Sequence, residues 1–151
     1  RIGYHPNIIL SGREINDNMG NHVALEMIKE MKKKKIKIKG SKILIMGLTF
    51  KENCTDIRNS GVKSVIEKLK KYNCNLDLHD PWANVDEIKK LYGIIPILKL
   101  NHNTYDGIIL AVAHDVFKNM GETEILNLCK ENHVIYDLKY LISKDQTNLR
   151  L

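Results

Sequence analysis

The sequence predicts an α/β protein with a doubly wound, mostly parallel sheet that is preceded by a long helix. Two observations support this prediction. From Ser41 onward, short apolar runs alternate with segments whose apolar residues recur at helical spacing. Each apolar run ends in small or polar residues, as strands of an open parallel sheet do before their loops. This alternation is typical of a Rossmann-like domain.

A single apolar stripe marks the long helix, which we expect over residues 16–35. Its members recur every four residues and are Ile15, Met19, Val23, Met27 and Met31, with Ala24 and Ile28 beside them. Lysines crowd its end, where the helix macrodipole favours cations. Residues 36–40 are expected to form a linker. We therefore expect the helix to precede the α/β domain, to pack on something else, and to leave apolar surface that favours self-association.

Four strands and three helices are expected after the linker. The strands are predicted at residues 42–47, 76–80, 107–113 and 134–137, with a further short strand considered at 94–98. The helices are predicted at residues 62–69, 85–92 and 123–132. Ser60 is the expected N-cap of the first of these helices.

Composition places the chain among globular proteins and argues against several classes of function. Its 151 residues suffice for one domain, 43% of them are hydrophobic and 28% are charged. No apolar run reaches the roughly 18 residues that a membrane span needs, so no membrane partner is expected. The first residue is not Met, and we expect a fragment of a longer chain.

The cysteines and lysines indicate the compartment and argue against a nucleic-acid partner. Cys54, Cys74 and Cys129 form no CxxC pair, which favours neither a disulfide framework nor a zinc site and indicates a reducing cytoplasm. Much of the formal charge of +6 lies in residues 32–35, 37 and 39, all of which are lysines. No aromatic residue interleaves with them, so a solvated helix end is favoured over a nucleic-acid patch.

A ligand is expected at the loop of residues 48–60, because ligands of open parallel sheets bind beyond the carboxyl ends of the strands. A nicotinamide-binding domain would show GxGxxG here. The loop follows a single glycine, so the chain is not a complete dinucleotide-binding domain. Lys51 and Arg58 can instead grip phosphates through their side chains. Glu52 and Asp56 can equally neutralise them in a salt-bridge cluster, and the residues alone leave both interpretations open.

One motif within this region resembles a known family. Residues 47–60, GLTFKENCTDIRNS, resemble the G-[LF]-[TA]-F-K-x-[ND]-x-x-D-x-R-x-S segment of the UDP-glucose/GDP-mannose dehydrogenase family. Residues 3–17 are similar to the segment after the catalytic GGxC loop in its UDP-N-acetylhexosamine branch. Residues 111–114 and 137–139 also match, in order and at the family's distances. The resemblance covers essentially the whole chain, and it is strongest to the UDP-N-acetylglucosamine/galactosamine 6-dehydrogenases of the Vi-polysaccharide type.

The resemblance implies roles for individual residues. Phe50, Lys51 and Lys139 would bind the UDP-sugar, with Lys139 standing where the family often has arginine. Arg58 would reach the NAD that a missing N-terminal domain binds, and Asp56 would orient Lys51 or Arg58. The family's catalytic cysteine, general base and assisting residues lie upstream, so no catalytic residue is expected in this chain.

Two further polar residues stand at the ends of predicted strands. His114 can donate to a ligand, or it can cap the following turn with Asp115, and the structural role is favoured. Asp80 stands where a dinucleotide-binding fold places a ribose-binding acid. Without the glycine-rich loop, we expect it to form the turn before Pro81. The other histidines lack metal-ligand spacing, so no metal site is expected.

By resemblance, the whole protein is an NAD-dependent UDP-sugar 6-dehydrogenase. It would convert the C6 alcohol of a UDP-N-acetylhexosamine to a carboxylate in two hydride transfers, for a bacterial surface polysaccharide such as a capsule. UDP-glucose and UDP-ManNAc are the alternative substrates, and a non-catalytic nucleotide-binding module is the alternative function. Residues 1–39 would end the central dimerisation domain, and residues 40–151 would form the UDP-sugar-binding domain. We expect a cytoplasmic homodimer, and a fragment that is inactive alone.

Overall fold

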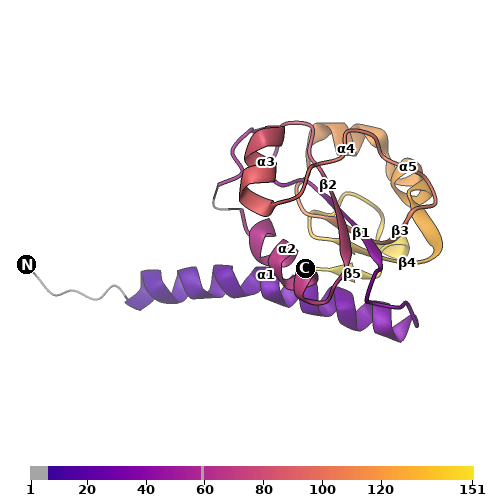
Figure 1. Cartoon of the computed structure of the whole chain (residues 1–151), viewed down its shortest axis with the longest axis horizontal. Helices are drawn as coiled ribbons and strands as arrows, with labels where there is room; N and C mark the ends of the chain where they lie inside the picture. Colours follow the sequence, from indigo (N-terminus) through magenta and orange to yellow (C-terminus); the bar gives the residue numbers. More distant parts are fainter. Residues whose placement is uncertain (1–6, 59) are drawn as a thin grey trace, which may run out of the picture.

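The computed structural model describes residues 7–58 and 60–151, with the side chains of the first helix described from residue 18 onward. The helices and strands are, in chain order, α1 (Asn7–Lys33), β1 (Lys42–Met46), α2 (Val62–Lys71), β2 (Asn75–His79), α3 (Val85–Tyr92), β3 (Tyr105–Leu110), α4 (Asp115–Met120), α5 (Glu122–Asn127), β4 (Cys129–Asp137), the 3₁₀ helix η1 (Lys144–Gln146) and β5 (Leu149–Arg150). Strands alternate with helices after a long first helix, which confirms the predicted fold class (Figure 1).

A five-stranded sheet forms the centre of the domain, and all of its neighbouring strands pair in parallel. The strand order is β2-β1-β3-β4-β5. The chain thus leaves β1 toward one edge, forms β2, and crosses back past β1 to form β3 on its other side. Such a reversal opens a crevice at the carboxyl ends of the two strands that flank it, here β1 and β3.

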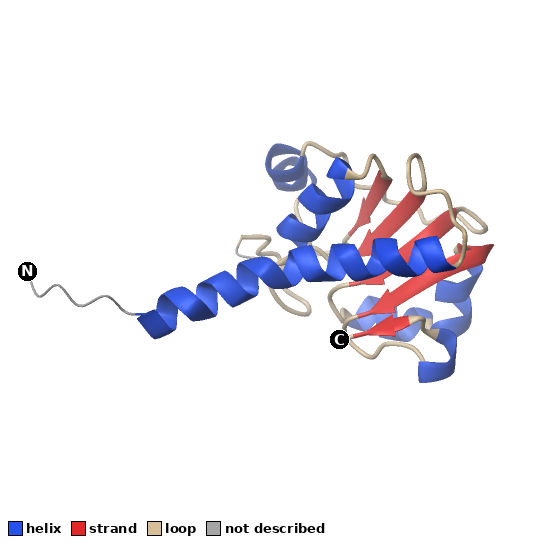
Figure 2. Cartoon of the chain, turned by 90° about the horizontal axis from the view of Figure 1, so that it is seen from below, coloured by secondary structure: helices blue, strands red, loops and turns tan. Residues whose placement is uncertain are grey.

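Alternate residues of β1 show how both faces of the sheet are covered. Ile43 and Ile45 belong to a core with α1, α2 and α3, whereas Leu44 and Met46 belong to a second core with α4 and α5. Figure 2 shows α1 lying across one face of the sheet. Because helices cover both faces, the inner strands carry apolar runs at residues 43–46, 107–110 and 134–136, which is why these runs are visible in the sequence.

The C-terminal half of α1 packs on the sheet, which corrects the expectation that this helix packs on something else. Its buried residues share one core with Ile43 and Val134, and they are Val23, Ala24, Met27, Ile28 and Met31. A Cβ on Gly107 of β3 would lie 2.2 Å from the Met27 methyl, so a glycine there admits the helix. Met19 stays 38% exposed, and Ile15 lies outside the described side chains. The surface expected to favour self-association is therefore largely covered within the domain.

Several boundaries differ from those that local patterns predict. The helix expected over residues 123–132 ends at Asn127 as α5, and β4 begins at Cys129. The cause is tertiary, because the carbonyl of Leu128 accepts the backbone N–H groups of Thr104 and Tyr105. Residues 94–98 form no strand and contribute one backbone hydrogen bond, from Ile97 to β2. Helix α4 and the two-residue strand β5 were not expected.

The starts of the helices agree better with the sequence. Helix α3 spans the predicted residues 85–92, and the side chain of its N-cap Asn84 accepts the N–H groups of Asp86 and Glu87. The Ser60 hydroxyl accepts the Val62 N–H at 3.3 Å, although Gly61 holds the cap position of α2 itself. Side chains that satisfy free N–H groups at a helix start are local signals, which is why they can be predicted.

The burial of α1 yields a prediction about stability. Met27→Ala is expected to lower the free energy of unfolding by about 3 kcal/mol, because it removes a fully buried side chain and leaves a cavity over Gly107. Leu25→Ala, on the exposed side of the same helix, is the control and is expected to change it by less than about 0.5 kcal/mol. Urea unfolding measures both values. Equal small effects would show that α1 does not belong to this core.

Candidate functional site

A pocket of about 1000 Å³ lies at the carboxyl edge of the sheet, where the reversal of strand order predicts a ligand. Residues after three strands line it: Thr49 and Phe50 after β1, Ala111 and Val112 after β3, and Leu138 and Lys139 after β4. The start of α2, the middle of α1 and the end of the loop before α2 form further parts of the wall, together with Leu91 and Leu151. The pocket therefore joins segments that are far apart in the sequence.

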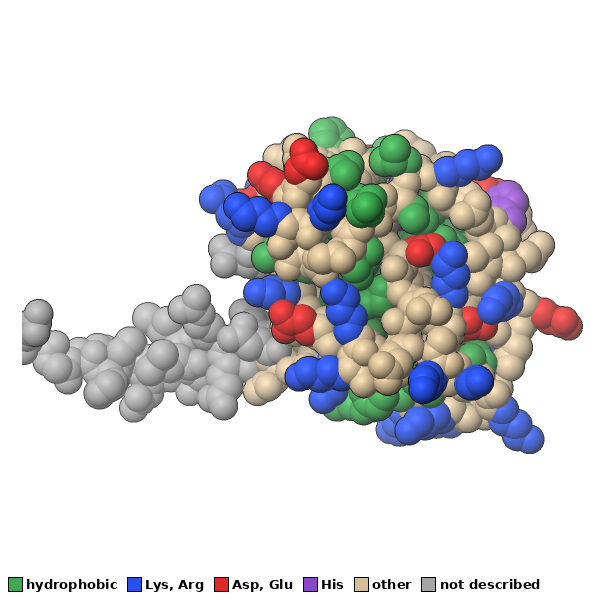
Figure 3. All heavy atoms as spheres, viewed as in Figure 1, with side chains coloured by type: hydrophobic (Ala, Val, Ile, Leu, Met, Phe, Trp, Pro, Cys, Tyr) green, Lys and Arg blue, Asp and Glu red, His purple; other side chains and the backbone are tan. Residues whose placement is uncertain are grey.

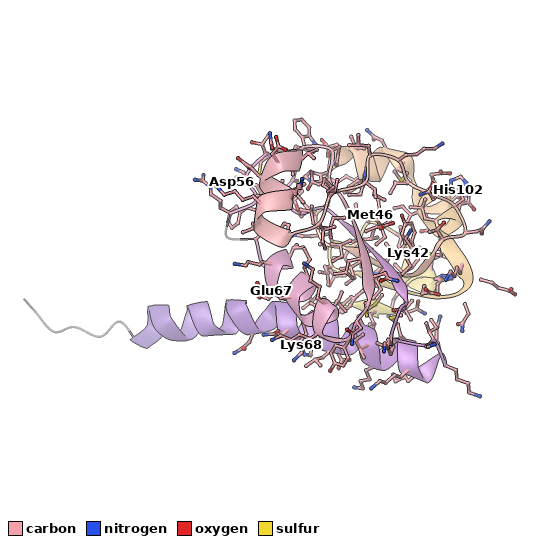
Figure 4. All side chains as sticks on the ribbon, in the orientation of Figure 1. Lys42, Met46, Asp56, Glu67, Lys68 and His102 are labelled. Carbon is pink, nitrogen blue, oxygen red and sulfur yellow. The ribbon has the colours of Figure 1, made fainter. Side chains whose placement is uncertain are left out.

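Gly47 is the point where β1 passes into the loop beside the pocket. Its φ of 90° is unfavourable for other residues, and an added Cβ would lie 2.5 Å from the Cβ of Val112. The ends of β1 and β3 are thus too close for a side chain at this position. Figure 4 shows Lys42 and Met46 at the two ends of β1, with Asp56 of the loop on the Met46 side.

The Asp80 carboxylate at the end of β2 holds the start of this loop. Its Oδ2 accepts the backbone N–H groups of Leu48 at 2.6 Å and Thr49 at 3.3 Å. Its Oδ1 accepts the N–H groups of Trp82 at 2.8 Å and Ala83 at 3.1 Å, which forms the turn expected around Pro81. Burial opposes ionisation of Asp80, but hydrogen bonds from His114 and from backbone N–H groups outweigh it and lower the pKa of the carboxyl.

His114 is fully buried and connects Asp80 to the middle of the same loop. Its Nδ1 accepts the backbone N–H of Asn53 at 2.9 Å, so the proton of the neutral ring must be on Nε2. That nitrogen donates to Asp80 Oδ2 at 3.0 Å. Phe117 packs against the ring edge-on, with centroids 5.3 Å apart. The structure thus places His114 in a supporting position under the loop, away from the pocket wall.

Two of the three cations expected to bind substrate or cofactor, Arg58 and Lys139, are paired with carboxylates of the loop. Asp56 accepts two hydrogen bonds from the Arg58 guanidinium, each of 3.0 Å, and these lower the pKa of its carboxyl. Lys139 Nζ lies 3.5 Å from Glu52 Oε1. The salt-bridge alternative is therefore present for Arg58 and Asp56, whereas Glu52 pairs with Lys139 instead of Lys51. Arg58 stays 82% exposed at its side chain, so its contact is open to competition.

Not all the expected binding residues line the pocket. Phe50, Arg58 and Lys139 do, and the Phe50 side chain is exposed there. Lys51 is exposed beside the pocket, and within the described part of the chain its ammonium forms no ion pair. Asp56 and His114 stand behind these residues, in contact with them or with their loop.

The wall formed by α1 and α2 was not foreseen from the sequence. Gly20 of α1 lies so close to α2 that an added Cβ would be 2.6 Å from the Cβ of Ser64 and 2.7 Å from the carbonyl of Gly61. These three residues line the pocket. An isolated glycine inside a helical pattern costs stability, and it was the available signal of this close approach.

The site offers no cradle for a dinucleotide and no metal centre in the residues described. Val112 occupies the space beside Gly47, the glycine that directly follows β1. A pyrophosphate therefore cannot approach the backbone there as it does in a glycine-rich loop. Within residues 18–58 and 60–151, no cluster of His, Cys, Asp and Glu could hold a metal ion. What remains is a pocket with apolar walls and a rim of cationic side chains, which defines an α/β domain suited to an anionic ligand.

Comparison with known proteins shows the family. Residues 44–144 match the model described as "UDP-glucose/GDP-mannose dehydrogenase family, UDP binding domain", and the chain belongs to this family. It is 50% identical over 150 residues to the UDP-N-acetyl-D-glucosamine 6-dehydrogenase of Salmonella typhi, and 51% identical over 150 residues to that of Pseudomonas aeruginosa. Each match covers 99% of this chain but only 35% and 36% of the relative. The chain thus spans about a third of the length of these curated relatives.

A solved structure supports the fold. The NDP-N-acetyl-D-galactosaminuronic acid dehydrogenase of Methanosarcina mazei Go1 superposes with a TM-score of 0.79 and 22% identity. The match covers 96% of this chain and 30% of that chain. At this identity the likeness concerns the fold alone, and it includes nearly the whole length described here.

The lowered pKa of Asp80 predicts how stability depends on pH. The folded protein binds this proton less readily than the unfolded chain, so the stabilisation is complete above the ordinary aspartate pKa of about 3.9. It is lost as the pH falls through the lower pKa of the folded state. Asp80→Asn is expected to cost about 2 kcal/mol at pH 7 and to reduce this dependence on acid.

Urea unfolding between pH 7 and pH 2.5 measures this effect. Asp145→Asn, on the exposed helix η1, is the matched control and is expected to follow the parent chain. An Asp80→Asn chain with the parent's stability and pH slope would show that the carboxylate does not hold the loop.

Proposed function

We propose that this chain is the nucleotide-sugar-binding part of an NAD-dependent UDP-N-acetylhexosamine 6-dehydrogenase, which oxidises the C6 alcohol to a carboxylate for surface polysaccharide synthesis. The observation that carries the proposal is the pocket at the β1/β3 crevice, which contains Phe50, Arg58 and Lys139 of the motifs shared with the family. Identities of 50% and 51% to two UDP-N-acetyl-D-glucosamine 6-dehydrogenases support the choice of sugar.

In this proposal the loop and the end of β4 bind the UDP portion of the substrate. Lys51, whose ammonium forms no ion pair with any described residue, follows Phe50 in the loop and would take the diphosphate together with Lys139. The diphosphate competes with Glu52 for Lys139, because both are anions that approach the same ammonium. Exposed ion pairs are weak, so a ligand with two phosphates can displace this one.

The role of the chain in the reaction is to position the substrate. NAD accepts the hydride when bound, and the site described here has no glycine-rich cradle for it. Arg58, which is exposed at the edge of the pocket, would face the cofactor on an upstream domain. Binding energy from the nucleotide would then hold C6 of the sugar at the reacting groups of that domain, including the cysteine that captures the aldehyde.

Exposed hydrophobic side chains support the idea that this chain works within a larger protein. Figure 3 shows them gathered over α3 and α4. In this part of the sequence, the exposed large hydrophobic residues include Trp82, Val85, Ile95, Leu98 and Val116, and Leu98 is 83% exposed. Exposed apolar side chains that gather on one face support a contact with another domain or subunit. The relatives are about three times as long, which leaves room for such domains.

The homodimer and the cytoplasmic location remain parts of the proposal. The three free cysteines support a reducing compartment. No described helix is both long enough and apolar enough to cross a membrane. The apolar stripe of α1 no longer supports the dimer by itself, because most of it is buried in this domain. The division at residue 39 likewise stays a prediction.

Calorimetry on this chain tests the proposal. UDP and UDP-GlcNAc are expected to bind weakly, and NAD is expected to show no binding. Lys51→Ala is expected to weaken UDP about tenfold, because a charge-assisted contact to phosphate is lost. Lys71→Ala, which removes the same charge at the far end of α2, is the matched control. Tight NAD binding, or equal UDP affinity in both variants, would contradict the proposal.

A further inference from the structure

The loop that carries Phe50 and Lys51 is held by buried side chains at its start and at its middle. At its start, Asp80 accepts the N–H groups of Leu48 and Thr49. At its middle, His114 Nδ1 accepts the N–H of Asn53 at 2.9 Å. The segment between these anchors therefore has little freedom to move along the rim of the pocket.

Asn53 is held by a second set of contacts. Its backbone has a φ of 53°, a left-handed conformation that asparagine tolerates better than most residues. Its side-chain Oδ1 accepts the N–H of Asp115 at 3.0 Å, and its Nδ2 donates to the Asp115 carboxylate at 2.8 Å. The loop is thus joined to the start of α4 as well as to the end of β2.

The Thr49 side chain links the loop backbone to His114. Its hydroxyl donates to the carbonyl of Lys51 at 2.9 Å and lies 3.3 Å from His114 Nε2. The backbone of Lys51 is therefore one residue away from the buried imidazole, through a side chain that is only 1% exposed. A shift of His114 would be transmitted to both sides of Lys51.

We infer that the buried His114 is the positioning residue of the UDP-binding loop, and that the hydrogen bond that its Nδ1 accepts from the Asn53 N–H sets where Phe50 and Lys51 meet the ligand. This inference rests on the proposed function of the loop. His114 itself does not touch the ligand. A loop that is already ordered binds more tightly, because binding does not have to fix its conformation.

Two substitutions of His114 by an amide residue each keep one of the two hydrogen bonds of its imidazole and remove the other. In His114→Asn, the side-chain oxygen can replace Nδ1 and still accept the Asn53 N–H. In His114→Gln, the side-chain nitrogen can replace Nε2 and still donate to Asp80. Tyr105→Phe is the matched control, because it removes a hydrogen bond of 2.9 Å to Asp77 from a buried side chain at the opposite edge of the sheet.

Calorimetry with UDP is the main measurement, at a temperature where all chains are folded. His114→Gln is expected to weaken UDP between fivefold and tenfold, which is about what one lost hydrogen bond is worth. His114→Asn and Tyr105→Phe are expected to stay within about twofold of the parent. Hydrogen exchange of the Asn53 amide is expected to accelerate in His114→Gln alone.

The outcomes distinguish a failure of this inference from a failure of the proposed function. Equal losses of UDP affinity in both His114 variants, or no loss in either while the parent binds UDP, would overturn the inference and leave the proposed function standing. A parent chain that does not bind UDP would overturn both. If a variant does not fold, hydrogen exchange of the parent chain tests the inference instead. An Asn53 amide that exchanges as fast as the Lys51 amide would show that His114 does not protect it and would overturn the inference.

Discussion

The site depends on the hydrogen bonds of the buried Asp80 carboxylate. Asp80 lies at the end of β2, accepts hydrogen bonds from the backbone of the loop after β1, and accepts one from the His114 imidazole after β3. These are three neighbouring strands of one sheet, so a single side chain ties their carboxyl ends together. Because hydrogen bonds to a buried charge are strong and costly to leave unmade, the loop has one favoured arrangement at the crevice.

The sheet was predictable because its strands are buried on both faces. Residues 43–46 of β1 and 107–110 of β3 form unbroken apolar runs, and α3 has both a stripe and a capping Asn84. The register of β4 and the existence of β5 depend on pairing partners, which local patterns do not reveal. The same holds for α1, whose stripe indicated an apolar face but not the surface it covers. Its contact with Gly107 shows that surface.

The position of the site was also predictable, but its internal contacts were not. Parallel topology places the loop of Lys51 and Arg58 at the carboxyl edge, and the family motif indicates candidate residues within it. The pairing of Lys139 with Glu52 and the bond from Asn53 to His114 join distant segments, so they appear only in the folded chain. The first shows that part of the cationic rim is neutralised before a ligand arrives. The second joins His114, which lies away from the pocket wall, to the loop beside the pocket.

The most direct test of this account is a crystal structure of the chain with UDP bound. The account predicts the diphosphate at the rim between Lys51 and Lys139, with the Lys139–Glu52 contact broken and the Asn53–His114 bond retained. UDP bound at another surface, with both carboxylate pairs of the loop unchanged, would contradict it.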